Sequence, residues 1–223
     1  MTDEEWSDFE MSLNKGMADV EIFMDGVHKF FQTHPSVRVD GKSVIHSMKQ
    51  RLKERSHLRE KIDRKSSPQR KITPDNVFRE ITDLAGVRIL LLFQSDFKII
   101  DESIRQRVAG GDWVLNETPK AFTWDPEASE FFEQFDLEVT RRDTSYTSVH
   151  YLLKPRADAA VCCELQVRTL FEEIWGEIDH KINYPTRTVN VACREQLKVL
   201  SKIVGAGSRL VDSIQRSLPD TDG

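Results

Sequence analysis

The feature that most limits the fold of this chain is the run at residues 86–93, Gly-Val-Arg-Ile-Leu-Leu-Leu-Phe, in which Arg88 carries the only charge. A nearly continuous apolar run of this length is typical of a strand that is buried on both faces of a sheet. It is far shorter than the roughly 18 apolar residues that a membrane span needs. A doubly covered strand requires helices on both sides, so the sequence predicts an α/β (α+β) fold with a mixed sheet flanked by helices.

The periodicity of the remaining chain supplies the other elements of such a fold. Alternating patterns predict strands at 137–141, 148–153 and 161–168. Helical patterns predict helices at 7–31, 44–65, 95–105, 170–183 and 190–218, with Ser95 as the N-cap of the third. Glycines, prolines and two tryptophans interrupt the pattern at 108–136, where we expect an ordered but irregular insertion.

The predicted strand at 161–168 alternates cleanly between apolar and polar side chains. One face carries Cys163, Leu165 and Val167, and the other carries Glu164, Gln166 and Arg168. A carboxylate, an amide and a guanidinium in one line suit a polar cleft, but they also suit an ordinary solvent-facing strand. The strand by itself leaves both interpretations open.

The helix that follows combines an apolar stripe with acidic residues. Phe171, Ile174, Trp175 and Ile178 have the i, i+3, i+4, i+7 spacing of a buried stripe. Glu172 and Glu173 fall in the first turn, where a helix favours negative charge. Asp179 and His180 lie off the stripe and are placed to reach a site.

The charge of the chain is unevenly distributed. The net charge is −5, but residues 49–71 contain ten Lys/Arg and only three acids, Glu54, Glu60 and Asp63. Such a segment in an acidic protein indicates either a local polyanionic ligand or a solvated charged helix. His57, Lys61 and Arg64 share one helical face, preceded by Arg51 and Lys53. Because the sequence has no P-loop, side chains and a metal ion would have to hold any phosphates.

The composition excludes several other classes of protein. The chain has 39% hydrophobic and 31% charged residues, which is typical of a folded, non-membrane domain. Its first residues are acidic, unlike a signal or transit peptide. Three cysteines form neither a disulfide framework nor a paired zinc motif. We therefore expect a cytoplasmic protein with no membrane partner.

Five motifs in order resemble those of the RelA/SpoT alarmone synthetase family, and together they cover residues 51–184. They are Arg51-Leu52-Lys53 with His57, Lys61 and Arg64; Asp83-Leu84-Ala85-Gly86-Val87-Arg88; Tyr146-Thr147-Ser148-Val149-His150; Glu164-Leu165-Gln166-Val167-Arg168-Thr169; and Trp175 to Tyr184. The resemblance implies a nucleotidyltransferase-like fold with a synthetase domain at 44–186. Residues 1–43 and 187–223 would then be N- and C-terminal helical extensions, and a homotetramer would be expected. We expect a small stand-alone member, because the sequence has no His-Asp dipeptide of the family's hydrolase domain.

The resemblance also implies a reaction and a role for each residue. The reaction is Mg²⁺-dependent transfer of pyrophosphate from ATP to the ribose 3′-hydroxyl of GTP or GDP, which makes (p)ppGpp. Asp83 and Glu164 would bind Mg²⁺, Glu164 would also accept the hydroxyl proton, and Arg88 would complete the catalytic set. The ATP-binding set would be Arg51, Lys53, His57, Lys61 and Arg64. The acceptor-binding set would be Tyr146, Ser148, His150, Gln166, Arg168 and His180.

Four positions depart from the family pattern. Ser145 and Thr147 replace the Gly and Arg that usually flank the acceptor tyrosine, His57 replaces a serine, and Pro185 replaces a lysine. These departures leave two alternatives open. One is a toxic relative that pyrophosphorylates the 3′ end of tRNA, with Arg55, Arg59, Arg70 and Lys71 on the tRNA backbone. The other is a non-catalytic regulator that binds nucleotides.

Overall fold

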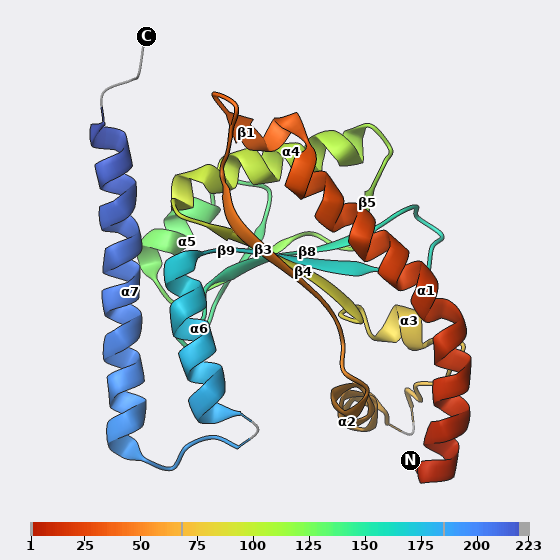
Figure 1. Cartoon of the computed structure of the whole chain (residues 1–223). Coiled ribbons are helices and arrows are strands. Elements are labelled where there is room, and N and C mark those ends of the chain that lie inside the picture. Colours follow the sequence, from red (N-terminus) through yellow and green to blue (C-terminus); the bar gives the residue numbers. More distant parts are fainter. Residues whose placement is uncertain (1, 68, 185, 219–223) are drawn as a thin grey trace.

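The computed structural model describes residues 2–67, 69–184 and 186–218, and its main feature is one mixed sheet (Figure 1). The helices are α1 (Asp3–Thr33), η1 (Pro35–Val37), α2 (Arg55–Lys65), α3 (Val77–Glu80), η2 (Gln94–Asp96), α4 (Phe97–Ala109), α5 (Pro126–Phe132), α6 (Leu170–Asn183) and α7 (Val191–Ser217). The strands are β1 (Arg38–Val39), β2 (Lys42–Ser43), β3 (Ile45–Leu52), β4 (Ala85–Leu91), β5 (Val114–Leu115), β6 (Lys120–Thr123), β7 (Glu138–Arg141), β8 (Ser148–Lys154) and β9 (Cys163–Thr169).

The sheet has the strand order β3-β4-β9-β8-β6-β7, with β5 paired to β8. Two of its inner strands, β4 and β9, run parallel, and their register places Gly86 beside Glu164 and Arg88 beside Gln166. Val87, Ile89, Leu165 and Val167 are buried, as the two sequence patterns predicted. The mixed sheet flanked by helices is therefore confirmed.

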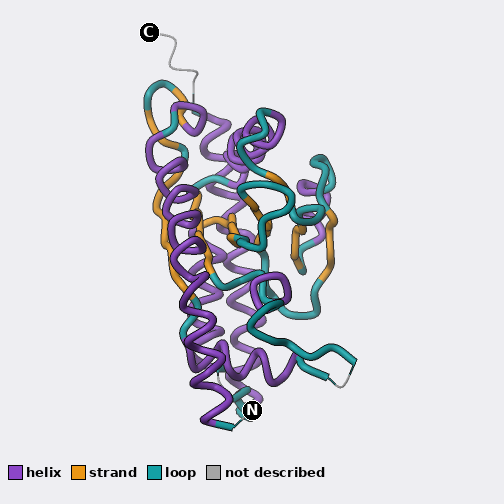
Figure 2. Tube along the Cα trace, turned by 90° about the vertical axis from the view of Figure 1, so that its right-hand side faces the viewer, coloured by secondary structure: helices purple, strands orange, loops and turns teal. Residues whose placement is uncertain are grey.

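Helix α1 covers one face of this sheet and shares its core. It contributes buried residues from Phe9 to Phe31, and it lies in front of the strands when the molecule is turned by 90° (Figure 2). A capping box at Thr2 and Glu5 begins the helix four residues earlier than the expected residue 7. Within the described residues, no helix is both long and apolar enough to cross a bilayer.

Helices α6 and α7 pack against each other at the opposite side of the molecule (Figure 1). Helix α6 has the predicted bounds, because Thr169 and Glu172 form a capping box at the end of β9. Helix α7 begins after the N-cap Asn190, whose side chain accepts from the backbone N–H of Cys193. The indole Nε1–H of Trp175 donates to the carbonyl of Leu197 at 3.1 Å, which ties the two helices together.

The largest error of the sequence prediction concerns residues 44–52. We expected one helix over 44–65, but only Arg55–Lys65 is helical, and Ile45–Leu52 forms the edge strand β3. Strand β3 pairs antiparallel with β4 along nearly its whole length. The exposed edge of β4 supplies backbone partners to this segment, and tertiary pairing overrides its local helical pattern. Arg51 and Lys53 consequently lie on and just after a strand, not on a helix.

Three smaller expectations were also wrong. Helix α4 begins at Phe97 with Asp96 as its N-cap residue, because the 3₁₀ turn η2 occupies 94–96 and Ser95 bonds to Asp212 instead. The segment 108–136 is not irregular, since β5, β6 and α5 add two strands and a helix to the domain. In α6 only Trp175 of the predicted stripe is buried, while Ile174 and Ile178 are 48% and 37% exposed.

Candidate active site

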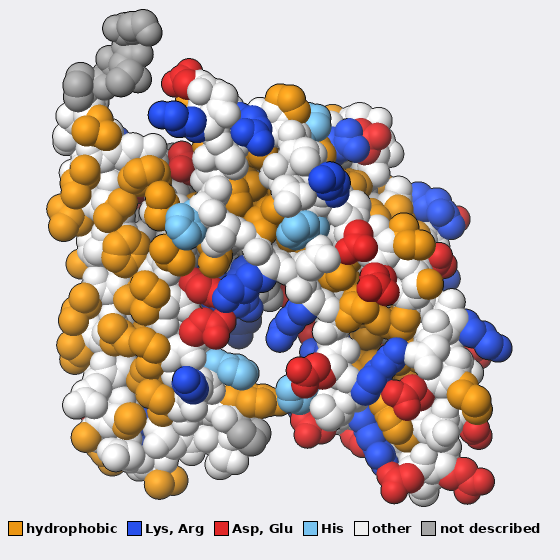
Figure 3. Space-filling model, in the orientation of Figure 1, with side chains coloured by type: hydrophobic (Ala, Val, Ile, Leu, Met, Phe, Trp, Pro, Cys, Tyr) orange, Lys and Arg blue, Asp and Glu red, His pale blue; other side chains and the backbone are white. Residues whose placement is uncertain are grey.

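A cleft of about 710 Å³ opens on the polar face of the central strands, between α6 and the ends of β3 and β4. Figure 3 shows this hollow, where acidic, basic and histidine side chains gather. Its volume lies within the usual range of small-molecule pockets, about 300–1,000 Å³. Its lining includes Lys49, Arg51, Asp83, Arg88, Tyr146, Glu164, Gln166, Arg168, Glu177, Asp179, His180 and Tyr184.

Asp83, at one end of the cleft, lies in the loop that enters β4. Its Oδ2 accepts from the Nζ of Lys53 at 3.0 Å and of Lys61 at 2.6 Å. Burial alone raises the pKa of Asp83, but the hydrogen bonds and charges of Lys61 and Lys53 more than offset this and lower it. The second oxygen, Oδ1, is buried and has no hydrogen-bond partner. Asp83 therefore combines a stable negative charge with an unused ligand atom.

Glu164 lies on β9 opposite Gly86 of β4, and both residues line the cleft. Its Oε1 contacts Nδ1 of His150 at 3.1 Å, and its Oε2 accepts from the amide of Gln166 at 2.8 Å. Burial raises its pKa, but the hydrogen bonds from His150 and Gln166 and the charge of His150 outweigh burial and lower it. The negative charge of nearby Asp83 raises the pKa of Glu164, so the two carboxylates interact electrostatically across the cleft.

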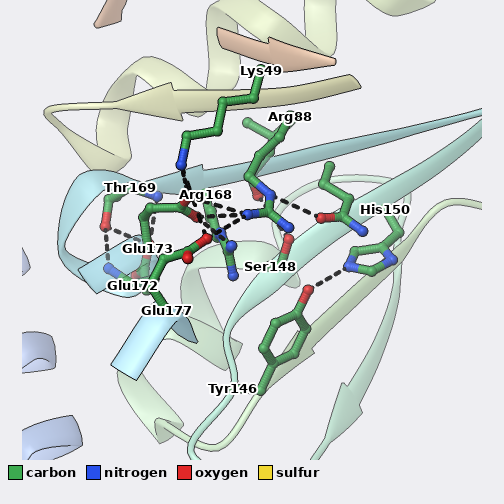
Figure 4. A network of polar contacts seen from close by, with 12 residues as sticks. Lys49, Arg88, Tyr146, Ser148, His150, Arg168, Thr169, Glu172, Glu173 and Glu177 are labelled. Atoms are coloured by element: carbon green, nitrogen blue, oxygen red, sulfur yellow. Dashed lines mark hydrogen bonds and ion pairs between the residues drawn. The ribbon is translucent and has the colours of Figure 1, made fainter. Parts of the chain in front are cut away.

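Tyr146 is linked to this carboxylate through His150. The hydroxyl of Tyr146 lies 2.9 Å from Nε2 of His150 (Figure 4). If Nδ1 carries the imidazole proton, His150 donates to Glu164 and accepts from Tyr146, so one tautomer satisfies both contacts. The guanidinium of Arg168 lies 5.8 Å from the centre of the Tyr146 ring. The ring is thus held by contacts at its hydroxyl and on its face.

The far end of the cleft holds a cluster of cations around Glu173 (Figure 4). Its carboxylate accepts from Lys49 Nζ at 2.9 Å and from Arg88 Nη1 at 3.1 and 3.2 Å, and it also pairs with Arg168. Arg88 reaches Glu177 at 3.3 Å as well. Burial raises the pKa of Glu173, but the hydrogen bond from Lys49 and the charges of Arg168 and Arg88 lower it overall.

Most of the residues predicted for the site meet at this cleft. Lys53, Lys61 and His150 contact its acidic residues, and eight others line it directly: Arg51, Asp83, Arg88, Tyr146, Glu164, Gln166, Arg168 and His180.

Three predicted site residues lie elsewhere. His57 faces the rim of the cleft, where its ring packs edge-on against Tyr184 at 5.5 Å. Ser148 is fully buried beneath the cleft, with its hydroxyl 3.5 Å from the carbonyl of Val167. Arg64 is exposed in the last turn of α2 and does not line the cleft.

The sequence prediction missed Lys49, Glu173 and Glu177 as members of the site. Glu173 was interpreted only as a favourable charge in the first turn of a helix. A usable signal was present, because Glu173, Glu177, His180 and Tyr184 recur at i, i+4, i+7 and i+11, which is one face of α6. That spacing is typical of a polar helix face, which can be directed either at the sheet or at solvent.

The arrangement defines a class of protein: a mixed α+β domain with a cleft that holds two carboxylates, a row of cations and a stacking aromatic ring. The sequence model of the family described as "Region found in RelA / SpoT proteins" matches residues 50–189. Because this match spans more than half of the chain, the protein belongs to the RelA/SpoT family.

Relatives of known sequence support this membership. The chain is 25% identical over 189 residues to the GTP pyrophosphokinase YjbM of Bacillus subtilis, covering 82% of this chain and 75% of the relative. It is 24% identical over 151 residues to YwaC, another GTP pyrophosphokinase of that organism, covering 66% of this chain and 61% of YwaC.

Solved structures show the same fold. The small alarmone synthetase 2 of B. subtilis matches with a TM-score of 0.67 at 20% identity, over 92% of this chain and 98% of that one. The small alarmone synthetase 1 of B. subtilis, bound to its product pppGpp, matches with a TM-score of 0.62 at 21% identity, over 96% and 97%. The expected nucleotidyltransferase-like fold is thereby confirmed.

Proposed function

We propose that this protein transfers pyrophosphate from ATP to the ribose 3′-hydroxyl of GTP or GDP and so makes (p)ppGpp. The observation that carries the proposal is the meeting of Asp83 and Glu164 with the cations of β3 and α2 and with Tyr146 in one cleft. Pyrophosphoryl transfer needs its phosphates positioned and their charge stabilised, and little other chemistry. The GTP pyrophosphokinase relatives support the same reaction.

The carboxylates at the mouth of the cleft fit a Mg²⁺ ion. Mg²⁺ is usually held by one or two carboxylates together with phosphate oxygens. Asp83 Oδ1 is buried without a partner, and the neighbouring carboxylate of Glu164 stays ionised because its pKa is lowered. Asp83 and Glu164 would therefore hold the ion, which neutralises charge on the β- and γ-phosphates when bound. Lys53 and Lys61 keep the Asp83 carboxylate fixed for this role.

The remaining residues act on the acceptor nucleotide. Tyr146 supplies a flat face for stacking a guanine base, and its hydroxyl is tied to His150. His150 in turn holds Glu164, the base that we propose for the 3′-hydroxyl proton. Stacking of the acceptor is thus connected by two hydrogen bonds to the group that removes its proton.

A second set of residues would hold the ATP phosphates. Lys53 and Lys61 would act as point charges, and Arg51 would act as a bidentate donor.

The test is to incubate the pure protein with labelled ATP, Mg²⁺, GDP or GTP, and deacylated tRNA in competition. We expect label in a 3′-pyrophosphorylated guanosine nucleotide, and no product after chelation of the metal. Label on the terminal adenosine of tRNA would establish the tRNA alternative instead. Nucleotide binding by calorimetry without any product, across acceptors and metals, would establish the non-catalytic regulator.

The structure weakens the sequence argument for tRNA. Thr147 is buried and bonded to Thr123, and Ser145 lies beside it at a small cavity behind the acceptor loop, so neither substitution opens the cleft. The basic residues invoked for a tRNA backbone are largely engaged within the chain. Arg55 contacts Glu10, Arg59 contacts Asp3, and Arg70 pairs with Glu80.

We also propose a homo-oligomer, a tetramer by resemblance, that uses α7. This helix buries Leu197 and Val204 against the domain but exposes an apolar seam on its other side (Figure 3). The seam comprises Val199, Ile203, Leu210 and Ile214, which are 53–62% exposed. Light scattering on the wild type should give a multiple of 25.8 kDa, and Ile203→Glu with Leu210→Glu should give the monomer mass. Helix α1, in contrast, caps the core.

A further inference from the structure

Glu173 is the most heavily engaged carboxylate of the cleft, and its partners come from three different strands. Lys49 belongs to β3, Arg88 to β4 and Arg168 to β9, and all three bond to this one side chain. The Glu173 side chain is only 6% exposed, whereas that of Lys49 is 58% exposed. The register of the sheet places Lys49 directly opposite Arg88, so a single buried anion offsets the repulsion between cations that the strands bring side by side.

The packing around this anion is closely fitted. Gly176, one turn further along α6, lies against the guanidinium of Arg168, and a Cβ at that position would come within 2.9 Å of Nη1. The helix can thus approach the strand closely enough for Glu173 to reach all three cations. Both carboxylate oxygens accept from Nη1 of Arg88, while Nε of Arg88 donates to Gln166. A guanidinium donates to phosphate oxygens as readily as to carboxylate oxygens.

The cations of the cluster face the cleft. Lys49, Arg88 and Arg168 line the cleft, and Glu177 lines it next to them. The three cations exceed the two acids, Glu173 and Glu177, by one positive charge. Glu173 stays ionised at neutral pH because its partners lower its pKa. The cations therefore already hold one anion, and any phosphate must compete with it.

We propose that Glu173 is a positioning residue that serves as an internal counter-anion: it holds Arg88 and Arg168 in the cleft, and phosphate groups of a bound nucleotide displace it from Lys49 and Arg88. Identifying the ligand as a nucleoside polyphosphate rests on the function proposed above. The anion subsite itself rests only on the three contacts. Glu173 then keeps the arginines aligned at the cost of weaker phosphate binding.

The test measures binding of inorganic tripolyphosphate by calorimetry to the wild type, Glu173→Gln and Glu177→Gln. Glutamine keeps the size of the side chain but removes its charge, so Glu173→Gln should bind the anion roughly tenfold tighter, with a steeper dependence on salt. Glu177→Gln is the matched control, because it removes the same charge from a side chain that is 58% exposed, and its affinity should change less than about threefold. Equal or weaker binding by Glu173→Gln overturns the proposal.

Turnover supplies a second, separable measurement. With nucleotide substrates, Glu173→Gln should lower KM while kcat also falls several-fold, because the arginines lose their anchor. If Glu173 had only a structural role, Glu173→Gln would lower the stability of the fold without tightening the binding of the anion. The binding measurement needs no turnover, so a protein that fails to make (p)ppGpp can still confirm or overturn the subsite.

A further variant covers the case in which Glu173→Gln does not fold, since it leaves Arg168 buried without its partner. Lys49→Gln changes an exposed side chain whose contacts are with Glu173 and Glu177. It should weaken tripolyphosphate binding about fivefold, because Lys49 is the cation most free to turn from Glu173 to the ligand. Unchanged affinity in Lys49→Gln overturns the proposal.

Discussion

The two ends of the cleft are built alike, with one fixed carboxylate surrounded by cations, yet they differ in how fully that carboxylate is used. At one end, Asp83 binds Lys53 and Lys61 through Oδ2 alone and leaves Oδ1 without a partner. At the other end, both oxygens of Glu173 accept from cations. An unused buried oxygen has to find a ligand, because leaving it unpaired costs about 1–3 kcal/mol.

This difference assigns different tasks to two residues of the same charge. Asp83 has an oxygen, Oδ1, that can accept a further cation, as the proposed Mg²⁺ site requires. Glu173 has no remaining capacity and instead fixes the cations that would meet the phosphates. The changes at Asp83 and Glu173 test this division directly. They stand below with changes at Tyr146 and Asp96, in decreasing order of expected effect.

Replacing Asp83 should have the largest effect, because Asp83→Asn removes the proposed metal ligand. We expect kcat to fall on the order of 10³-fold, the range seen when a charge-stabilising group is removed from an active site. Binding of tripolyphosphate should persist, since the Glu173 cluster is intact. Glu164→Gln should give the same pattern. Near-wild-type turnover in Asp83→Asn would show that Asp83 is not part of the mechanism. The proposed contrast between Asp83 and Glu173 would then be wrong.

Replacing Tyr146 should separate the acceptor from ATP. Base stacking on an aromatic ring contributes about 1–3 kcal/mol, so Tyr146→Ala should raise the KM for the guanosine acceptor roughly 5- to 150-fold. The KM for ATP should change little. Tyr146→Phe keeps the ring and loses only the bond to His150, and should therefore have a much smaller effect on acceptor KM. An equal effect of Tyr146→Ala on both substrates would contradict the assignment.

Acid should unfold the wild type partly through the Glu173 cluster. The pKa of Glu173 is lowered from its ordinary value of 4.5, so its ion pairs stabilise the folded state above about pH 4.5 and this stability is lost as the pH falls further. Urea unfolding at about pH 7 and 3.5 should show a smaller loss for Glu173→Gln than for the wild type. Glu177→Gln, the more exposed control, should follow the wild type. An identical loss in all three would place the acid sensitivity elsewhere.

The smallest effect concerns Asp96, a carboxylate whose neighbours are Gln215 and a second acid, Asp212. Burial, and to a lesser degree Asp212, raises its pKa from 3.8 to about 6, although the hydrogen bond with Gln215 acts in the opposite direction. Its charge therefore destabilises the fold above pH 6, and protonation relieves this as the pH falls. Asp96→Asn should stabilise the protein at about pH 7.5 by about 1 kcal/mol, a value reduced for partial exposure. The gain should vanish near pH 4, and urea titrations at both pH values would show whether it does.

The sequence predicted the elements in which local pattern and tertiary environment agree. The apolar run at 86–93 and the alternation at 161–168 became the central strands β4 and β9. Helix α6 was predicted with its observed bounds, because its capping residues lie within it and just before it. Segment 44–52 failed because its strand depends on a partner, β4, that lies more than 30 residues further along the chain. Ile174 and Ile178 failed because α6 packs through Trp175 and its polar face, not through the full apolar stripe.

By itself the sequence determined the strands β4 and β9, the family resemblance and most of the residues that line the cleft. These features can be read from the sequence because periodicity and motif spacing depend only on residues that are close together along the chain. Only the tertiary structure decided which charge meets which. Glu173 is 124 residues from Lys49 and 85 from Arg88, and no local pattern encodes a contact over that distance. The pairing of β4 with β3 and with β9, and the close approach of α6 to these strands, bring one buried carboxylate within reach of three cations.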